Sequence, residues 1–340
     1  MTNPLVSICI PTYNAEKTVG ATLDTVLKQR YRNLEIWIVD NASSDGTLEA
    51  VAEFDDPRIK IQRNKTNVGG EGNFNRCIQM ATGKYTAIFH ADDQYESDMV
   101  EKQVAFLEAN PQAGVVFTGA SLIDDEERCI GRIAPPKELD SPTHLYDFAT
   151  ILRAVLRNSN FLICPSAMAR TDVYQQEIVR WRGELFKSSA DLDVWLRIAQ
   201  RHPVGLLPQP LMRYRISKGQ FSAGVRQRIG RADFFLVTDH YLQQKDVRSI
   251  LDRRDIESYM RLDRRDRVMR ATNAMLAGQP GEIQGLLHDL YSWSSLKAAW
   301  QTGRGLGVLV AGSYLRLLNA FGLNKFAQVS LGFLKRAMRK

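Results

Sequence analysis

The chain has 340 residues, of which 44% are hydrophobic and 24% are charged. This composition excludes an intrinsically disordered protein, and the length suits one domain of roughly 200–250 residues with a smaller additional region. The net charge of +7 is unevenly distributed, because residues 1–220 hold 25 basic and 28 acidic side chains, whereas residues 221–340 hold 20 and 10. The basic last third favours an anionic partner, a membrane surface or nucleic acid; the alternative is a solvated helical face.

Cysteine usage and apolar runs bear on the cellular compartment. Cys9, Cys77, Cys129 and Cys164 do not have the spacing of a metal site, and we interpret them as reduced, buried thiols of a cytosolic protein. The N-terminus lacks an apolar segment of signal-peptide length. The longest apolar run near the end, residues 306–312, is far shorter than the roughly 20 residues that span a bilayer. We therefore expect a protein that does not cross a membrane.

The first 120 residues alternate between strand and helix patterns. An apolar run at residues 5–10 predicts a buried strand that ends at Pro11. Asn14 is placed to cap a helix that extends to about residue 29. Further strands are predicted at residues 34–39, 58–63, 85–90 and 114–123, with helices between them.

This alternation predicts an α/β fold with a mainly parallel central sheet and helices on both faces. In such sheets, ligands bind beyond the carboxyl ends of the strands. Asp40 and residues 91–93 both fall at predicted strand ends.

The pattern is less regular after residue 124. Residues 160–170 predict a strand, and residues 189–191 open a helix that extends to about residue 201. Beyond residue 225 the pattern is helical and basic, without internal repeats.

Three acidic side chains fit the chemistry of a metal-assisted transfer to a hydroxyl group. Mg²⁺ and Mn²⁺ prefer oxygen ligands, which Asp92 and Asp93 would supply. Asp191, ahead of an apolar helix, is placed to act as a general base. Each also has an ordinary interpretation, because adjacent aspartates are common in solvated turns and aspartate is a frequent helix N-cap.

Short motifs in a fixed order point to a known family. They are Pro-Thr-Tyr-Asn at 11–14, Val-Asp-Asn-Ala-Ser-Ser-Asp-Gly-Thr at 39–47, Asn67-x-Gly69, Ala81-x-Gly83-x-Tyr85, His-Ala-Asp-Asp at 90–93, Ala-Asp-Leu-Asp-Val-Trp-Leu-Arg at 190–197, and Tyr214-Arg215. With these motifs, residues 4–222 resemble the bacterial family-2 glycosyltransferases with the GT-A fold.

The resemblance implies an inverting, metal-dependent glycosyltransferase. It would transfer a sugar from a nucleotide-diphosphate sugar to the hydroxyl of a saccharide or lipid-linked acceptor, in surface polysaccharide, lipopolysaccharide or glycolipid biosynthesis. Asp191 would be the catalytic base, and Asp93 would bind Mn²⁺ or Mg²⁺. The residues implied in donor binding are Pro11, Tyr13, Asn14, Asp40, Asn67 and Asp92.

The chain departs from the family pattern at two places. Ala91 replaces the first acidic residue of the metal motif, which leaves coordination mainly to Asp93. Ser217 and Lys218 stand where many relatives carry a histidine, and Lys218 would either meet the donor phosphates or be a surface lysine. His90 is interpreted as a satisfied core histidine rather than a ligand.

Two other functions are considered for the whole chain. One is a non-catalytic nucleotide-sugar-binding or scaffold protein on the same fold. The other is a nucleic-acid-binding protein, which the lack of a recognition motif disfavours.

The extent of the resemblance and the helical pattern after it divide the chain into two parts. These are a catalytic domain at residues 1–222 and a helical, basic region at residues 223–340.

The basic region repeats apolar residues at helical spacing from Leu306 to Leu334, accompanied by Lys and Arg. Such a helix can lie in a membrane interface. The alternatives are packing on the catalytic domain or on a second copy of the chain, as in a homo-oligomer. We expect a cytoplasmic protein that is peripheral on the inner face of the cell membrane.

Overall fold

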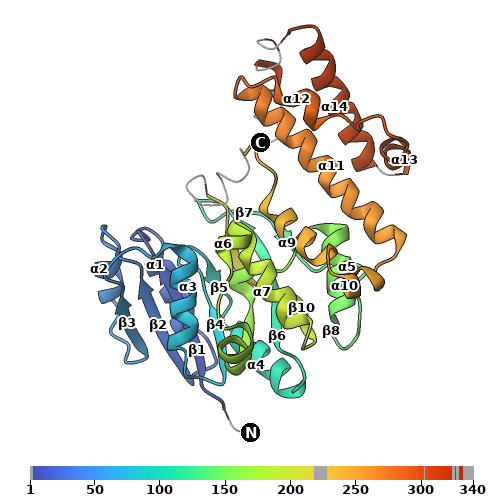
Figure 1. Cartoon of the computed structure of the whole chain (residues 1–340). Coiled ribbons are helices and arrows are strands. Elements are labelled where there is room, and N and C mark those ends of the chain that lie inside the picture. Colours follow the sequence, from blue (N-terminus) through green and yellow to red (C-terminus); the bar gives the residue numbers. More distant parts are fainter. Residues whose placement is uncertain (1–2, 218–227, 302, 324–325, 327–328, 332–340) are drawn as a thin grey trace. The chain divides into compact units, whose positions relative to one another are not determined.

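The computed structural model describes residues 3–217, 228–301, 303–323, 326 and 329–331 (Figure 1). The chain forms two compact units, Met1–Ser217 and Lys218–Lys340, each of which is described by itself. The predicted boundary at residues 222–223 lies outside the described residues, as does Lys218.

The first unit is built around one sheet, whose main path has the strand order β3-β2-β1-β4-β9-β6-β10-β5. Strand β7 pairs with β6, and β8 pairs with β10. The strands are β1 (Val6–Thr12), β2 (Leu34–Asp40), β3 (Ile59–Arg63), β4 (Tyr85–Ile88), β5 (Gln94–Tyr95), β6 (Val115–Ile123), β7 (Cys129–Ile133), β8 (Leu145–Tyr146), β9 (Met168–Arg170) and β10 (Val204–Arg215).

Parallel pairing holds the first four strands together, and β10 is also parallel to β6. The short strands β5, β7, β8 and β9 join the sheet in antiparallel pairs. The predicted α/β fold with a mainly parallel central sheet is therefore confirmed. The hydrophobic core lies against this sheet and includes Ile8, Leu23, Ile36 and Phe89.

Right-handed crossovers place the first helices on opposite faces of the sheet. Helices α1 (Val19–Leu27) and α2 (Thr47–Ala52) follow connections that run from β1 towards β3, whereas α3 (Gly69–Met80) returns from β3 to β4. The direction of the connections therefore reverses between β1 and β4. This is the point at which an open α/β sheet offers space for a ligand beyond its strand ends.

Pro11 lies inside β1 rather than ending it, which corrects the predicted strand boundary. The Phe89 N–H donates to Cys9 O, so Cys9 and, two residues later, Pro11 turn their backbone groups towards β4. Pairing between β1 and β4 stops at Cys9 and Ile88. Because proline has no N–H, Pro11 cannot add a further hydrogen bond to β4.

The remaining helices of the first unit flank the second half of the sheet. Helix α7 begins at Ala190, close to the predicted start, and carries Asp191 in its first turn. The predicted strand at residues 160–170 is mostly irregular, because only Met168–Arg170 pairs with neighbouring strands. These helices are α4 (Met99–Ala109), α5 (Phe148–Asn158), α6 (Gly183–Phe186) and α7 (Ala190–Ala199), with a π-helical turn at Val173–Ile178 and 3₁₀ turns at Cys164–Ser166 and Lys187–Ser189.

The second unit is helical, as predicted. Its helices are α9 (Asp233–Leu242), α10 (Lys245–Ser249), α11 (Arg253–Leu276), α12 (Glu282–Leu286), α13 (Trp293–Gln301) and α14 (Gly303–Ala320). A second hydrophobic core joins α11, α12 and α14 through residues such as Met275, Leu286 and Leu315. Within the described residues, none of the helices combines the length and apolarity needed to cross a bilayer.

Candidate active site

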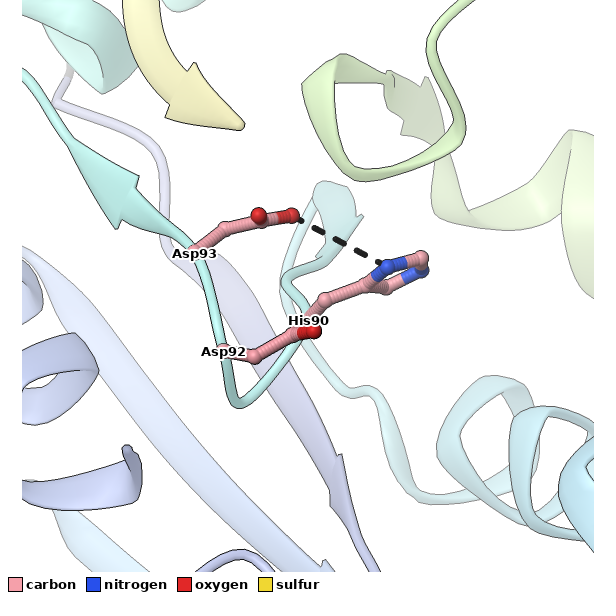
Figure 2. Close-up of side chains that lie close together, drawn as sticks. All are labelled: His90, Asp92 and Asp93. Carbon is pink, nitrogen blue, oxygen red and sulfur yellow. Dashed lines mark ion pairs between the residues drawn. The ribbon is translucent and has the colours of Figure 1, made fainter. Parts of the chain in front are cut away.

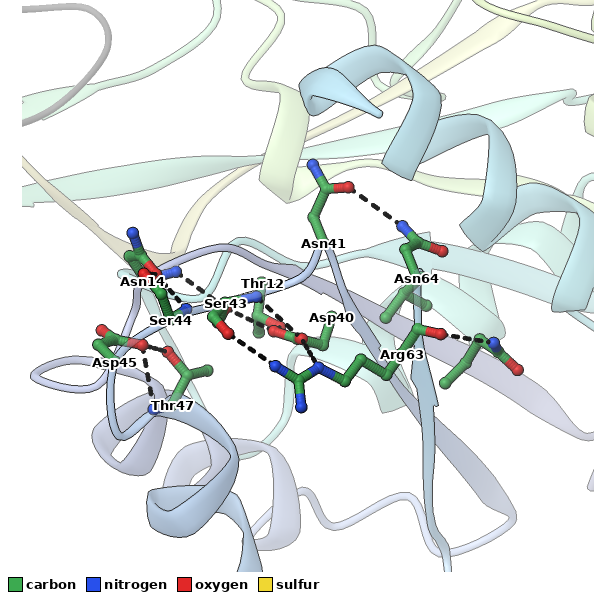
Figure 3. A network of polar contacts seen from close by, with 12 residues as sticks. Thr12, Asn14, Asp40, Asn41, Ser43, Ser44, Asp45, Thr47, Arg63 and Asn64 are labelled. Atoms are coloured by element: carbon green, nitrogen blue, oxygen red, sulfur yellow. Dashed lines mark hydrogen bonds and ion pairs between the residues drawn. The ribbon is translucent and has the colours of Figure 1, made fainter. Parts of the chain in front are cut away.

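Asp40 ends β2 and organises the loop that follows it (Figure 3). Its carboxylate is fully buried. Oδ1 accepts hydrogen bonds from Ser43 Oγ at 2.5 Å and from Thr12 Oγ1 at 3.3 Å. Oδ2 accepts from the Ser43 N–H at 3.1 Å and lies 3.4 Å from Arg63 Nε. Both oxygens therefore already have partners within the protein, and the predicted contact of Asp40 with a nucleotide stays a prediction.

Asn14 belongs to the same loop network and does not cap a helix, contrary to the prediction. It has a φ of 49°, and its N–H donates to Ser43 Oγ at 3.0 Å. Its side-chain oxygen accepts from the Ser44 N–H at 2.9 Å (Figure 3). Helix α1 starts only at Val19, because Asn14 ties the end of β1 to the loop after β2.

Asn67 is held next to this loop by Asn41. Asn41 Nδ2 donates to Asn67 Oδ1 at 2.8 Å, and Asn64 Nδ2 donates to Asn41 Oδ1 at 3.1 Å. Tyr13, directly after β1, leaves 52% of its surface exposed. An exposed aromatic ring next to a polar loop is suited to stack on a planar base.

His90, Asp92 and Asp93 form a compact cluster in the turn after β4 (Figure 2). One ligand-type atom from each lies within 4.8 Å of the others. Asp93 is fully buried, and its Oδ1 accepts from the Arg215 N–H at 2.8 Å. Its Oδ2 lies 3.9 Å from His90 Nδ1 but accepts no hydrogen bond from the described residues.

The cluster is electrostatically unfavourable as it stands. Burial, and then the negative charge of Asp92, raises the pKa of Asp93 well above its usual value. Burial lowers the pKa of His90, so its ring tends to be neutral and compensates little of the negative charge. His90 Nε2 is also buried without a hydrogen-bond partner among the described residues. The interpretation of His90 as a satisfied core histidine is therefore wrong.

Arg215, at the end of β10, fixes this turn in place. Besides the contact from its N–H to Asp93, its Nε donates to Asp92 O at 3.0 Å. Its Nη1 donates to Asp124 O at 3.1 Å, and its Nη2 donates to Glu127 Oε1 at 3.1 Å. The guanidinium thus joins the turn after β4 to the turn between β6 and β7. Sequence reasoning assigned Arg215 no role, although its motif at a strand end pointed to the site.

Asp191 is partly buried in the first turn of α7. Burial raises its pKa to about 6, against the opposing effect of hydrogen bonds from the Leu192 N–H and from Asn160. The Asn160 Nδ2 lies 3.5 Å from Asp191 Oδ2. A carboxylate with this pKa is ionised at neutral pH yet more basic than an ordinary aspartate, which suits a general base.

Asp193, two residues later, has a different environment. It is fully buried, and Arg182 and Arg197 both bind its carboxylate, with Arg182 Nε at 2.9 Å and Arg197 Nε at 3.0 Å. This ion-paired group is structural, since its oxygens serve to hold the start of α7 in place.

The charges of Asp93 and Asp191 both act on two further side chains, those of Cys164 and Tyr214. Burial raises the pKa of the Cys164 thiol, and the charges of Asp191 and Asp93 raise it further. Burial also raises the pKa of Tyr214, with added effects from Asp93, Asp92, Cys164 and Asp191. Asp40 lies at the end of β2, and β1 lies between β2 and β4 in the sheet. That Asp40 belongs to the same site as Asp93 and Asp191 stays a prediction.

The cysteines only partly follow the expectation. All four are free, and Cys9 and Cys77 are buried, whereas Cys164 is partly exposed. Cys129 is exposed at the start of the hairpin strand β7, which corrects its predicted burial.

Comparison with known proteins identifies relatives. The family description "Glycosyl transferase family 2" matches residues 7–177, which include every residue of the site up to Cys164. A curated relative from Escherichia coli, UDP-Glc:alpha-D-GlcNAc-diphosphoundecaprenol beta-1,3-glucosyltransferase WfgD, is 33% identical over 139 residues. That match covers 41% of this chain and 54% of the relative. The chain spans about half the length of curated relatives that it matches.

Solved structures show the same fold. TarS 1-349 of S. aureus, in complex with UDP-GlcNAc, superposes with a TM-score of 0.58 at 15% identity, over 92% of this chain and 91% of that one. The mannosyltransferase PcManGT from Pyrobaculum calidifontis, in complex with GDP-Man and Mn2+, has a TM-score of 0.51 at 19% identity, over 95% and 88%. The fold of this chain is therefore the GT-A fold predicted from its motifs.

Proposed function

The chain belongs to glycosyl transferase family 2, and on this premise we propose that it transfers a sugar from a nucleotide-diphosphate sugar to an acceptor hydroxyl. The observation that carries the proposal is the placement of two carboxyl groups with raised pKa values, Asp93 and Asp191, near Tyr214 and Cys164. One oxygen of Asp93 has no hydrogen-bond partner among the described residues, and burial raises the pKa of Asp191 despite its contact with Asn160. Burying charged groups in this way is costly, so their presence together favours a catalytic over a merely structural role. A scaffold protein would not need both.

The nucleotide of the donor would lie along the loop after β2. Support comes from the exposed ring of Tyr13 beside Pro11, and from the ordered positions of Asn14, Asp40 and Asn67. Asp40 would contribute mainly by shaping this loop, because its oxygens already accept four contacts. The structural neighbours named above bind UDP-GlcNAc and GDP-Man, which supports a nucleotide-sugar donor for this chain.

The residues of the turn after β4 fit a divalent cation. Asp93 Oδ2 and His90 Nε2 are buried polar atoms without hydrogen-bond partners among the described residues, and Asp92 adds a third ligand-type group. Asp93 would hold Mn²⁺ or Mg²⁺ with help from Asp92 and His90, although Ala91 removes one acidic residue. When bound, the cation neutralises the charge that develops on the leaving diphosphate. The Mn2+ of PcManGT supports this assignment.

Asp191 would accept the proton of the acceptor hydroxyl as that oxygen attacks the sugar. Its pKa of about 6 keeps it ionised at neutral pH. One base with no covalent intermediate corresponds to a single displacement, so the configuration at the anomeric carbon would be inverted. Determining the anomeric configuration of the initial product by NMR checks this, and a product of retained configuration would contradict it.

The acceptor would be a saccharide, free or lipid-linked, in the assembly of a surface polysaccharide, lipopolysaccharide or glycolipid. The name of WfgD specifies a diphosphoundecaprenol-linked acceptor, which supports the lipid-linked form. A panel of nucleotide sugars with Mn²⁺, read by thermal stabilisation, would identify the donor first, because a bound ligand raises the melting temperature.

The metal assignment is tested with Asp93→Asn and with Asp55→Asn, an exposed aspartate outside the site, as the matched control. Wild-type protein and the control should gain thermal stability from Mn²⁺ with a nucleoside diphosphate, and Asp93→Asn should not. Its donor turnover should fall by about 10²–10³-fold, corresponding to several kcal/mol of lost charge stabilisation. Full activity of wild-type protein in excess chelator would contradict a metal-dependent reaction.

A further inference from the structure

Helix α13 exposes an apolar stripe that its own packing does not use. Trp293 and Trp300 are 82% and 93% exposed, and Leu296 between them is also exposed. These positions are three and seven residues apart, so they lie on one face of the helix. The opposite face buries Ser295 and Ala298.

Helix α14 repeats this arrangement beside α13. It buries Leu315 and Leu318 in the core of the second unit. Leu306, Val310 and Leu317 are exposed, and Phe321, immediately after the helix, is 73% exposed. The two helices pack against each other, so both apolar faces belong to one hairpin. Soluble monomers rarely leave several large apolar side chains exposed together without a binding partner.

The charge of this segment narrows the choice of partner. Residues 290–340 contain no Asp or Glu, and their eight basic residues are Lys297, Arg304, Arg316, Lys325, Lys335, Arg336, Arg339 and Lys340. A second copy of the same segment would bring like charges together, which disfavours self-association. Anionic headgroups, in contrast, complement the basic residues, and tryptophan prefers the boundary between headgroups and acyl chains.

We propose that the α13–α14 hairpin docks on the surface of an anionic lipid bilayer, with Trp293 and Trp300 inserted at the level of the headgroups. The hairpin lies flat in the interface, as amphipathic helices do, and the net positive charge of residues 290–340 favours anionic headgroups. This inference is independent of the proposed transfer reaction, because it depends only on the second unit.

Vesicle flotation with the full chain tests the proposal. Wild-type protein should float with phosphatidylcholine vesicles that contain phosphatidylglycerol, and should bind pure phosphatidylcholine at least about tenfold more weakly, because each basic residue near an anionic surface contributes roughly 1 kcal/mol. Raising the salt concentration should weaken the binding to anionic vesicles. Failure of the wild-type chain to bind anionic vesicles at low salt would overturn the proposal.

The double variant Trp293→Ser with Trp300→Ser should lower the affinity for anionic vesicles by about tenfold or more, since two large apolar side chains no longer leave water. Ile130→Ser, which changes an exposed apolar residue on β7 of the first unit, is the matched control and should bind like wild type. Equal binding by the double variant and the wild type would overturn the proposal. Because both tryptophans are exposed, the melting temperature should stay unchanged.

Two further measurements separate the lipid surface from other occupants. Brominated lipids should quench wild-type fluorescence, and Trp300→Phe should reduce the quenching while the protein still binds. Sedimentation analysis tests whether a second copy of the chain binds this face instead. A dimer that the double variant dissociates, combined with no vesicle binding, would assign the face to a second copy and overturn the lipid assignment.

Discussion

The loop after β2 and the turn after β4 both follow central parallel strands, and each region contains a fully buried aspartate, but the two carboxyl groups have different surroundings. Asp40 has contacts from Thr12, Ser43 and Arg63, which satisfy both of its oxygens. Asp93 is equally buried, yet one of its oxygens has no hydrogen-bond donor among the described residues. The same side chain type therefore stabilises the fold in one region, whereas in the other it keeps an oxygen that fits the proposed divalent cation.

Helix α7 shows the same contrast within one turn. Asp193 is bound by two arginines, whereas Asp191 is contacted weakly by Asn160 and has a raised pKa. Substitutions that remove the charge should consequently have opposite effects on stability at the two kinds of position. Only the change at Asp191 should act directly on the chemical step.

The largest expected effect is on catalysis by Asp191→Asn. Loss of a general base should reduce turnover by about 10²–10⁴-fold, while the affinity for donor remains. In the wild type, kcat/KM should fall as the pH drops below about 6, because protonation removes the base. The variant should lack this acid limb. Steady-state kinetics between pH 5 and 9 measure both effects, and a variant with more than a tenth of wild-type turnover would exclude Asp191 as the base.

Next in size is the loss of stability in Asp193→Asn. The change leaves the guanidinium groups of Arg182 and Arg197 without their carboxylate partner. Breaking a buried ion pair from one side costs about 3–5 kcal/mol. Urea unfolding monitored by circular dichroism gives the free energy of unfolding. A change below 1 kcal/mol would mean that this pair does not hold the start of α7.

Asp40→Asn should destabilise the first unit by about 2–3 kcal/mol, since hydrogen bonds to a charged acceptor are worth about 1.5–3 kcal/mol each and the amide retains only one acceptor oxygen. The same urea experiment measures it, with Asp55→Asn as the exposed control. Donor affinity should fall in parallel with the loss of loop order. Unchanged stability combined with lost donor binding would instead show that Asp40 contacts the nucleotide directly.

The smallest expected effect is a gain of stability in Asp191→Asn. Because the folded pKa of Asp191 is raised to about 6, its ionised form opposes folding above that pH. Each pKa unit corresponds to about 1.4 kcal/mol, which partial exposure reduces to a total of about 1–2 kcal/mol. The variant should unfold at a higher temperature than wild type at pH 8, and the difference should disappear towards pH 4. Equal melting temperatures at pH 8 would contradict a raised pKa.

The sequence identified the parts of the site that strand and helix patterns position. Asp93 was placed by the rule that ligands bind at strand ends, and Asp191 by the start of an apolar helix. The partners of these groups could not be predicted in the same way. Asn160 and Cys164 lie in a segment that was predicted to be a strand but is mostly irregular, and Arg215 acts through contacts with residues more than 80 positions away.

Which carboxyl groups have hydrogen-bond partners could not be predicted from the sequence either. Asp40 and Asp93 follow similar apolar runs. Only the folded chain shows that Ser43 and Arg63 contact the first, whereas no donor among the described residues reaches the second oxygen of Asp93. Asn14 looked like a helix cap because its residue type favours that role. Its positive φ and its contacts across the loop depend on β2, which is distant in sequence.

Pro11 gives β1 an asymmetric end. On the side of β2, the pairing continues as far as Thr12 and Asp40. On the side of β4 it stops at Cys9 and Ile88, because Pro11 has no backbone N–H to extend it. An amino acid with a backbone N–H at this position could donate one more hydrogen bond, to Phe89 O. This bond would extend the sheet into the start of the turn that contains His90. A single imino acid thus keeps two neighbouring strands apart where the chemistry is expected, at no cost to the pairing on its other side.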